Sequence, residues 1–157
     1  MQGQAAMKHF IGRYVNKIDA KGRISVPAPF RAVIQARGLA TIALYPSLSD
    51  ACIEGCGMDR IDGLAEQLPD DPLPGAKEEA IARLIIGNAR ETPFDGGGRI
   101  ILPEDFMAMA SLTDKGAFIG TGKQFQIWNP ERLDEAQALL HKNVGALRRQ
   151  DHGGAGS

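Results

Sequence analysis

The sequence predicts an α+β fold, mainly β, that arose by duplication of one unit. The first observation is a nine-residue motif, Asp19-Ala-Lys-Gly-Arg-Ile-Ser-Val-Pro27, which recurs as Asp95-Gly-Gly-Gly-Arg-Ile-Ile-Leu-Pro103. The second is that a phenylalanine follows each proline by three residues, as Phe30 and Phe106. The third is that helical and apolar extended segments follow both copies in the same order. Two copies indicate one duplicated structural unit rather than a long solenoid.

Each motif is typical of a β-hairpin closed by a three-residue turn. Pairing Asp19 with Arg23 leaves residues 20–22 in the turn, which needs one residue of positive φ, and Gly22 supplies it. The second copy repeats this arrangement with Asp95, Arg99 and, at the turn position, Gly98. The register predicts four further pairs: Ile18 with Ile24, Lys17 with Ser25, Phe94 with Ile100, and Pro93 with Ile101.

Prolines and hydrophobic periodicity predict the remaining elements. Pro27 and Pro103 end the second strand of each hairpin, and the first turn of a helix tolerates Pro29. We expect helices at 28–37, 76–86 and 104–110, and strands at 40–45, 51–56, 117–119 and 124–128. In the helix at 76–86 we expect Ala80, Ile81 and Leu84 to face inward. A last helix starts after Pro130, and its expected inward positions are Leu133, Ala136, Leu140, Val144 and Leu147.

These elements divide the chain into five segments. We expect a first module at 13–59 and a second at 89–132, each built on one copy of the motif. A helical connector at 60–88 joins them and contains the proline-rich stretch 69–75. A C-terminal helix at 133–150 precedes a glycine-rich tail at 151–157, which we expect to be disordered.

The composition excludes several classes of protein. With 43% hydrophobic and 24% charged residues, the chain resembles an ordinary soluble globular protein. No run approaches the roughly 18 apolar residues of a membrane span, and residues 1–10 hold no signal-peptide core. We therefore expect a cytoplasmic protein without membrane contact. Cys52 and Cys56 are too few for a disulfide scaffold and no second half of a zinc site accompanies them, so we expect free thiols and no metal.

The charge is unevenly distributed along the chain. Up to Gly38 there are seven cationic residues and one acidic residue, although the whole chain has a net charge of −1. Such a local basic field attracts phosphate even on a near-neutral protein. A solvated charged face explains the same count, and charge alone leaves both readings open.

No pattern of catalytic residues accompanies the repeat. Asp19 and Asp95 face arginines across a turn, which suits a structural ion pair better than a catalytic carboxylate pair. The run Gly96–Gly98 lacks the Lys-Ser/Thr of a phosphate-binding loop, and no nucleophile–base motif is present. We expect no enzyme activity, no catalytic residue, no cofactor and no small-molecule substrate.

The cationic residues of the hairpins suit DNA. A two-stranded ribbon fits the major groove, where the arginine fork can contact guanine O6 and N7 together. In the first copy, Arg13, Lys17, Lys21 and Arg23 lie on the outward face or at the tip. The second tip has Arg99 but no lysine, so the first copy should carry more of the electrostatic attraction. Arg23 and Arg99 could equally be only the structural partners of the aspartates.

Together these motifs resemble the twin signature of the MraZ family, which has two SpoVT-AbrB-like modules. The resemblance includes Phe10-Ile-Gly12 before the first motif, Leu84-Ile-Ile-Gly-Asn-Ala-Arg90 before the second, and Phe125-Gln-Ile-Trp128. It covers about Phe10 to Leu140. The chain differs from the family in two respects: Cys52-Ile-Glu-Gly-Cys-Gly57 replaces a more apolar stretch, and the second loop lacks the lysine of the first.

The resemblance implies a fold, an assembly and a function. The fold is a double-split β-barrel in which two AbrB-like modules exchange hairpins. The assembly is a homo-oligomeric ring of about eight or more subunits. The function is repression of the division and cell-wall gene cluster, through direct repeats upstream that include the protein's own promoter, on the nucleoid. The implied DNA-binding residues are Lys21, Arg23 and Arg99, with Arg13 as a further candidate. An AbrB-like antitoxin-type protein, or a structural ring without nucleic acid, remains an alternative.

Overall fold

The computed structural model describes residues 8–71 and 76–155 of the chain. Within them the strands are β1 (Arg13–Lys17), β2 (Arg23–Ser25), β3 (Thr41–Pro46), β4 (Ile53–Gly57), β5 (Arg90–Pro93), β6 (Arg99–Ile101), β7 (Lys115–Gly120) and β8 (Phe125–Trp128). The helices are α1 (Ala28–Ala36), α2 (Met58–Glu66), α3 (Lys77–Asn88), α4 (Glu104–Met109) and α5 (Pro130–Ala155). Six strands form one antiparallel sheet in the order β1-β7-β8-β4-β3-β5, and β2 and β6 form a separate two-stranded ribbon. The predicted α+β class is confirmed.

The two copies of the repeat exchange strands. β1, from the first copy, pairs with β7, and β5, from the second, pairs with β3. The ribbon takes one strand from each copy, with Ile24 opposite Ile100. The exchange of hairpins implied by the family resemblance is therefore present in the strand pairing.

This exchange corrects the predicted hairpin register. Ile18 does bridge Ile24, as expected. The other three pairs are wrong, because Lys17 pairs with Lys115, Pro93 pairs with Thr41 and Phe94 forms no bridge with Ile100. The hairpins separate just beyond their turns because the flanking strands gain longer, better buried partners in the other copy.

Aromatic side chains fill the space between the ribbon, α1 and the large sheet. Phe30 is fully buried, and its ring centroid lies 5.4 Å from that of Phe10 and 5.4 Å from that of Phe125. Gly55 makes room for the ring of Phe125, because a Cβ there would overlap it. The phenylalanine that recurs after each motif is thus a core residue, and it fixes the start of α1 against the sheet.

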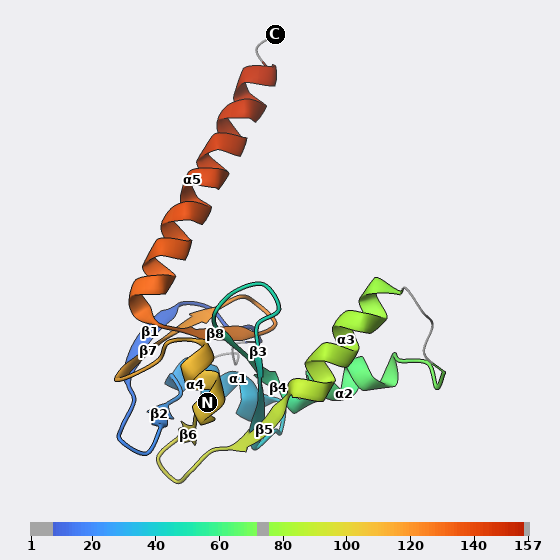
Figure 1. The fold of residues 1–157 in the computed structure, drawn as a ribbon, viewed down its shortest axis with the longest axis vertical. Helices are drawn as coiled ribbons and strands as arrows, with labels where there is room; N and C mark the ends of the chain where they lie inside the picture. Colours follow the sequence, from blue (N-terminus) through green and yellow to red (C-terminus); the bar gives the residue numbers. More distant parts are fainter. Residues whose placement is uncertain (1–7, 72–75, 156–157) are drawn as a thin grey trace, which may run out of the picture.

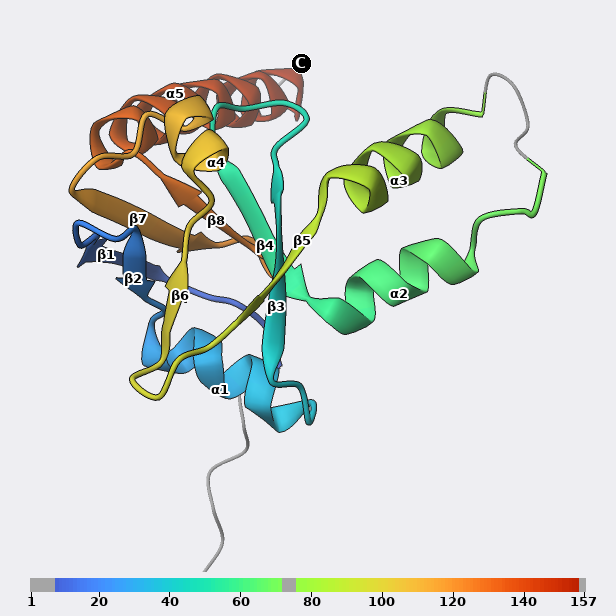
Figure 2. The ribbon, with the colours of Figure 1, turned by 60° about the horizontal axis from the view of Figure 1, so that its bottom comes forward.

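Figures 1 and 2 show that α5 and the α2–α3 pair project from this body in different directions. Part of the proline-rich stretch between α2 and α3, residues 72–75, lies outside the described residues. The predicted inward face of α3 is wrong, since Ala80, Ile81 and Leu84 are exposed. Ala82 is buried and Ile85 and Ile86 pack on the sheet instead. The helix is rotated because α2 and β3 cover it from a side that periodicity cannot identify.

α5 is longer than predicted and mostly exposed. It extends to Ala155, five residues past the expected end at 150, because adding a residue to an established helix needs no new nucleation. Leu133 is buried against the sheet. Beyond it, the predicted inward positions Leu140, Val144 and Leu147 are exposed, because α5 leaves the body after its first turns. No helix among the described residues has both the length and the apolarity to cross a membrane.

Candidate nucleic-acid interface

The β2–β6 ribbon has one buried face and one exposed face. Ile24 and Ile100 point inward and are 0% and 1% exposed. Side chains alternate along a strand, so the residues on either side of each isoleucine point outward. These outward residues are Arg23, Ser25, Arg99 and Ile101, and Ile101 is 61% exposed. The ribbon therefore presents two arginines, diagonal to each other, on one solvent-facing surface.

Asp19 organises the first turn, residues Asp19–Arg23, which we name loop 1. Its Oδ1 accepts hydrogen bonds from the backbone N–H groups of Lys21 and Arg23, both at 2.9 Å. Its Oδ2 accepts a 2.6 Å bond from Nε of Arg23. Gly22 has φ +80°, as the turn requires. The Arg23 N–H bond is the main cause that lowers the pKa of the Asp19 carboxyl below its ordinary 3.8.

Loop 2, residues Asp95–Arg99, repeats this geometry. Oδ1 of Asp95 accepts from the backbone N–H groups of Gly97 and Arg99 at 2.9 Å, and Oδ2 accepts from Nε of Arg99 at 2.9 Å. Gly98 has φ +76°. The pKa of Asp95 is lowered for the same first cause, the Arg99 N–H. The aspartate of each repeat is thus both the turn former and the ion-pair partner of its arginine.

The two roles considered for the arginines are compatible in this geometry. Each aspartate holds only the Nε side of its guanidinium, and the Arg23 and Arg99 side chains remain 32% and 39% exposed. Nη1 of Arg99 lies 4.0 Å from Oδ2 of Asp19, so the two loops are neighbours. The terminal nitrogens of Arg23 make no ion pair with the described residues, and those of Arg99 have only this 4.0 Å approach to Asp19, so both arginines are oriented in advance for an outside acceptor.

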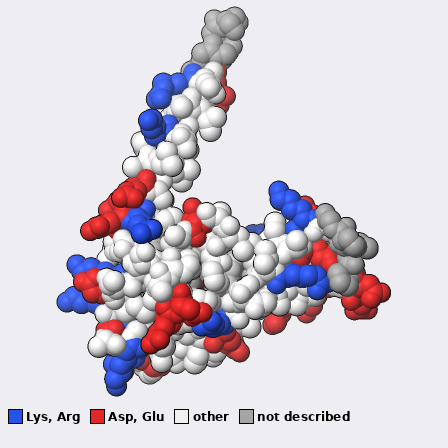
Figure 3. Space-filling model, in the orientation of Figure 1, with Lys and Arg blue, Asp and Glu red and all other residues white. Residues whose placement is uncertain are grey.

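The other predicted cationic residues differ in position. Lys21 is exposed in loop 1. Nη2 of Arg13 makes a 2.6 Å ion pair with Asp134 of α5, so Arg13 belongs to the packing of α5 rather than to the ribbon. Figure 3 shows basic and acidic side chains intermixed on one face of the molecule, including its lower end, where Figure 1 places both turns. The attraction for an anion therefore depends on a few local groups.

Sequence analysis missed three residues next to the loops. Ser25 and Ile101 occupy equivalent outward positions of the ribbon. The repeat itself held their signal, since both lie two residues past the motif arginine. The third residue, Arg31, follows Phe30 and lies against Gly98 of the other copy. No sequence signal pointed to it, because the exchange of strands creates that contact.

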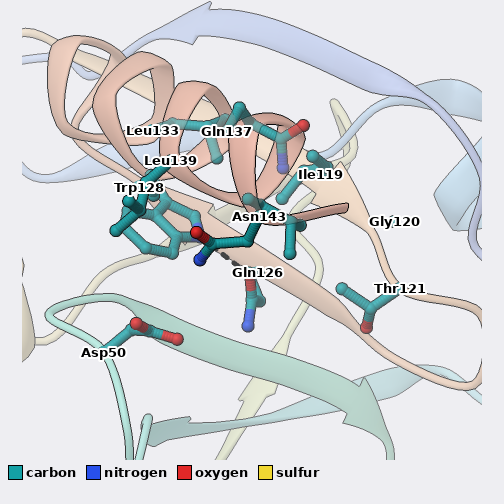
Figure 4. Close-up of a pocket in the computed structure, with 12 residues that line it drawn as sticks. Asp50, Ile119, Gly120, Thr121, Gln126, Trp128, Leu133, Gln137, Leu139 and Asn143 are labelled. Carbon is teal, nitrogen blue, oxygen red and sulfur yellow. Dashed lines mark hydrogen bonds between the residues drawn. The ribbon is translucent and has the colours of Figure 1, made fainter. Parts of the chain in front are cut away.

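A separate hollow of about 530 Å³ lies between α5 and the outer face of the sheet. Figure 4 shows Trp128, Leu133 and Leu139 on its lining, with Asp50 at one side. Leu139 and Leu140, from the exposed part of α5, make this groove largely apolar. Cys52 and Cys56 are free and buried, Cys52 beside Trp128 and Leu133 and Cys56 in a separate cluster with Tyr45 and Ile61, and burial raises the pKa of each thiol to about 12.

Acidification should destabilise the loops. Asp19 and Asp95 have folded pKa values below 3.8, so the stability they contribute is present above pH 3.8 and is lost as the pH falls through the folded values. We expect the melting temperature to fall below that pH, and the double variant Asp19→Asn/Asp95→Asn to show a smaller fall. Asp105, whose pKa the Arg90 hydrogen bond lowers, keeps part of the effect in the variant. Identical falls in thermal melts of both proteins would contradict this assignment.

The sequence is similar to proteins of one family along most of its length. The family model described as "MraZ protein, putative antitoxin-like" matches residues 85–144. A protein named Transcriptional regulator MraZ from Rhodospirillum rubrum is 44% identical over 139 residues, covering 87% of this chain and 90% of the relative. Proteins of the same name from Parvibaculum lavamentivorans and Rickettsia akari are 40% and 35% identical, covering 94% and 90% of this chain and 99% and 98% of the relatives.

Proposed function

The chain belongs to the MraZ family of transcriptional regulators, and from this membership we propose that it binds double-stranded DNA through the β2–β6 ribbon and its two loops. We further propose that it does so at direct repeats upstream of the division and cell-wall genes, its own promoter included, and represses them. The reading unit combines the modules 13–59 and 89–132.

One observation carries this proposal: both ribbon arginines face solvent with their Nε atoms held by aspartates. A two-stranded ribbon has the width of the major groove, and outward arginines on it can reach guanine edges. Ile101 and Ser25 beside them suit a thymine methyl group and a hydrogen bond to a base. Lys21 at the end of the ribbon suits a phosphate.

A ring of about eight or more copies completes the proposal. Its support is that two different surfaces of one chain are apolar and unpaired within it. One is the α5 stripe, which we define as Leu139, Leu140, Val144 and Leu147, between 45% and 61% exposed. The other is on α3, where Ile81 and Leu84 are 38% and 52% exposed. Contact between two unlike surfaces of identical chains is heterologous, and a heterologous contact closes into a ring when its rotation allows.

Charge supports the same contact. Between residues 138 and 150 the charged residues of α5 are Lys142, Arg148 and Arg149, all positive. α2 and α3 together carry five carboxylates, from Asp59, Asp62, Glu66, Glu78 and Glu79, against three cationic residues, Arg60, Lys77 and Arg83. The positive α5 surface and the negative α2–α3 surface attract each other. This difference in charge favours contact between unlike surfaces over contact between like ones.

The test is a mobility shift on the DNA upstream of the protein's own gene, over a salt series. A ribbon with so few cationic groups binds one site weakly, while several ribbons on one assembly make later contacts intramolecular and raise affinity about 10²- to 10⁴-fold. We expect tight binding to the repeat array, weak binding to one repeat, and a log–log salt slope near −0.9 for each phosphate contacted. Equal affinity for one repeat and the array would refute the multivalent part. Failure to bind the array would refute DNA recognition itself.

A further inference from the structure

Three arginines of the described residues are half-buried, and the rest are exposed. Two of the three, Arg23 and Arg99, hold the loop aspartates. The third, Arg31 on α1, makes no ion pair or side-chain hydrogen bond with any residue that the structure describes, and its Nε is buried without a partner. A buried N–H donor without an acceptor is unfavourable, so the position of this side chain calls for an explanation.

Arg31 lies against loop 2 of the other copy. A Cβ at Gly98 would overlap Nη1 of Arg31 and would lie 2.7 Å from its Cζ. Gly98 is buried, and Val26 N–H donates to its carbonyl oxygen at 3.1 Å, which fixes the loop against the residue that leads into α1. The guanidinium therefore lies beside the turn of loop 2, next to the end of the ribbon.

The repeat shows that this position has an equivalent. Phe30 and Phe106 correspond, so Arg31 corresponds to Met107. Sδ of Met107 lies 3.7 Å from where a Cβ of Gly22 would be, so it covers loop 1 much as Arg31 covers loop 2. A thioether fills this position adequately. The guanidinium beside loop 2 is therefore not required for packing.

The charge of Arg31 gives the two loops the same number of cationic residues. Loop 1 has Lys21 beside Arg23, whereas Gly97 takes the lysine position in loop 2. Arg31, from the first copy, adds the second cation to loop 2. Each loop then has two cations and one aspartate, although only loop 1 shows this in its own sequence.

Resting on the proposed function, we propose that Arg31 is a DNA-contacting residue that binds a backbone phosphate beside loop 2. A ribbon in the major groove has phosphates along both flanks, which is where Arg31 lies. An ionised phosphate oxygen would accept charge-assisted hydrogen bonds from the terminal nitrogens of this half-buried guanidinium. On this proposal loop 2 is the electrostatic equal of loop 1, whereas the sequence alone favours the first copy.

The variant Arg31→Met tests this by giving loop 2 the residue that covers loop 1. We expect affinity to fall about tenfold for each engaged loop, the scale of one charge-assisted hydrogen bond. The fall should be equal for the upstream duplex and for an unrelated duplex, because a phosphate contact reads no sequence. The salt slope should decrease by about 0.9 for each phosphate that the variant no longer neutralises. Arg31→Lys, which keeps the charge, should restore most of the slope.

Arg37→Met is the control, because it removes one positive charge just past the opposite end of the same helix, where Arg37 pairs with Asp59 at 3.5 Å. If Arg31→Met matches the wild type in affinity and slope, or changes them only as much as Arg37→Met does, the inference is overturned. A lower melting temperature with an unchanged slope also overturns it and makes Arg31 structural. Wild-type protein that binds neither duplex would overturn the proposed function as well, which separates the two failures.

Discussion

Arg23→Ala is expected to weaken binding to the upstream array by tenfold or more for each engaged loop, and to leave the fold and assembly unchanged. A bidentate arginine–guanine pair contributes about 1–3 kcal/mol of discrimination, and every copy in the proposed assembly would lose one. Loop 1 should keep its shape, because Oδ1 of Asp19 still accepts the backbone N–H groups of residues 21 and 23. The measurement is a titration of the array and of an unrelated duplex, with light scattering for the assembly.

Two further variants separate base-specific recognition by Arg23 from the electrostatic attraction of its positive charge. Arg23→Lys keeps the cation and loses the fork, so it should retain affinity for unrelated DNA and lose preference for the array. Arg132→Ala removes an exposed arginine of α5, distant in sequence from both loops, and should change little. If Arg23→Ala protein unfolds, and its remaining affinity simply follows the folded fraction, then the ion pair with Asp19 is the whole role of this residue.

The second large effect is expected from the α5 stripe. Leu140→Glu/Leu147→Glu places two carboxylates on a surface that we propose is buried between copies, so the assembly should dissociate into smaller species. Each released chain keeps its ribbon, and affinity for the array should fall about 10²- to 10⁴-fold, to that of a single ribbon. Light scattering gives the assembly size, and a mobility shift gives the affinity.

The control carries the same charges on the other side of the same helix. Ala138→Glu/Gly145→Glu has the same seven-residue spacing, and at about 3.6 residues per turn these positions lie opposite Leu140 and Leu147. This control should remain assembled. Assembly by both variants, or dissociation of both to the same extent, would show that the stripe does not join the copies.

Local features of the loops could be predicted from the sequence. The Asp-x-x-Gly-Arg spacing alone defines the turn, the positive φ of Gly22 and Gly98, and the pairing of each aspartate with its arginine, because all of these interactions join residues at most four positions apart. The order of the strands and of α1, α3, α4 and α5 followed from periodicity and proline positions, whereas α2 was expected only as part of a helical connector. Local structure that depends only on residues within one short segment can be predicted from the sequence of that segment.

Features that depend on distant partners could not be predicted. Lys17 could pair with Ser25 or with Lys115, and only the completed sheet decides for the second. Leu84 and Leu140 have the periodicity of buried residues, yet both face solvent in the single chain. Periodicity reports that a surface is apolar and not what covers it. Arg31 was missed for a related reason, since its neighbour Gly98 is brought to it by strand exchange.

The shared ribbon bears on the symmetry of the DNA sites that we propose it binds. Two identical chains that paired in this way would bind a palindrome, because the same residues would contact both half-sites. Here one polypeptide supplies both strands, so selection can alter either half without touching the other. Ser25 has already diverged from Ile101, and Lys21 from Gly97. An asymmetric DNA-binding surface of this kind suits direct repeats. Copies arranged head to tail would present that surface to successive repeats in the same orientation.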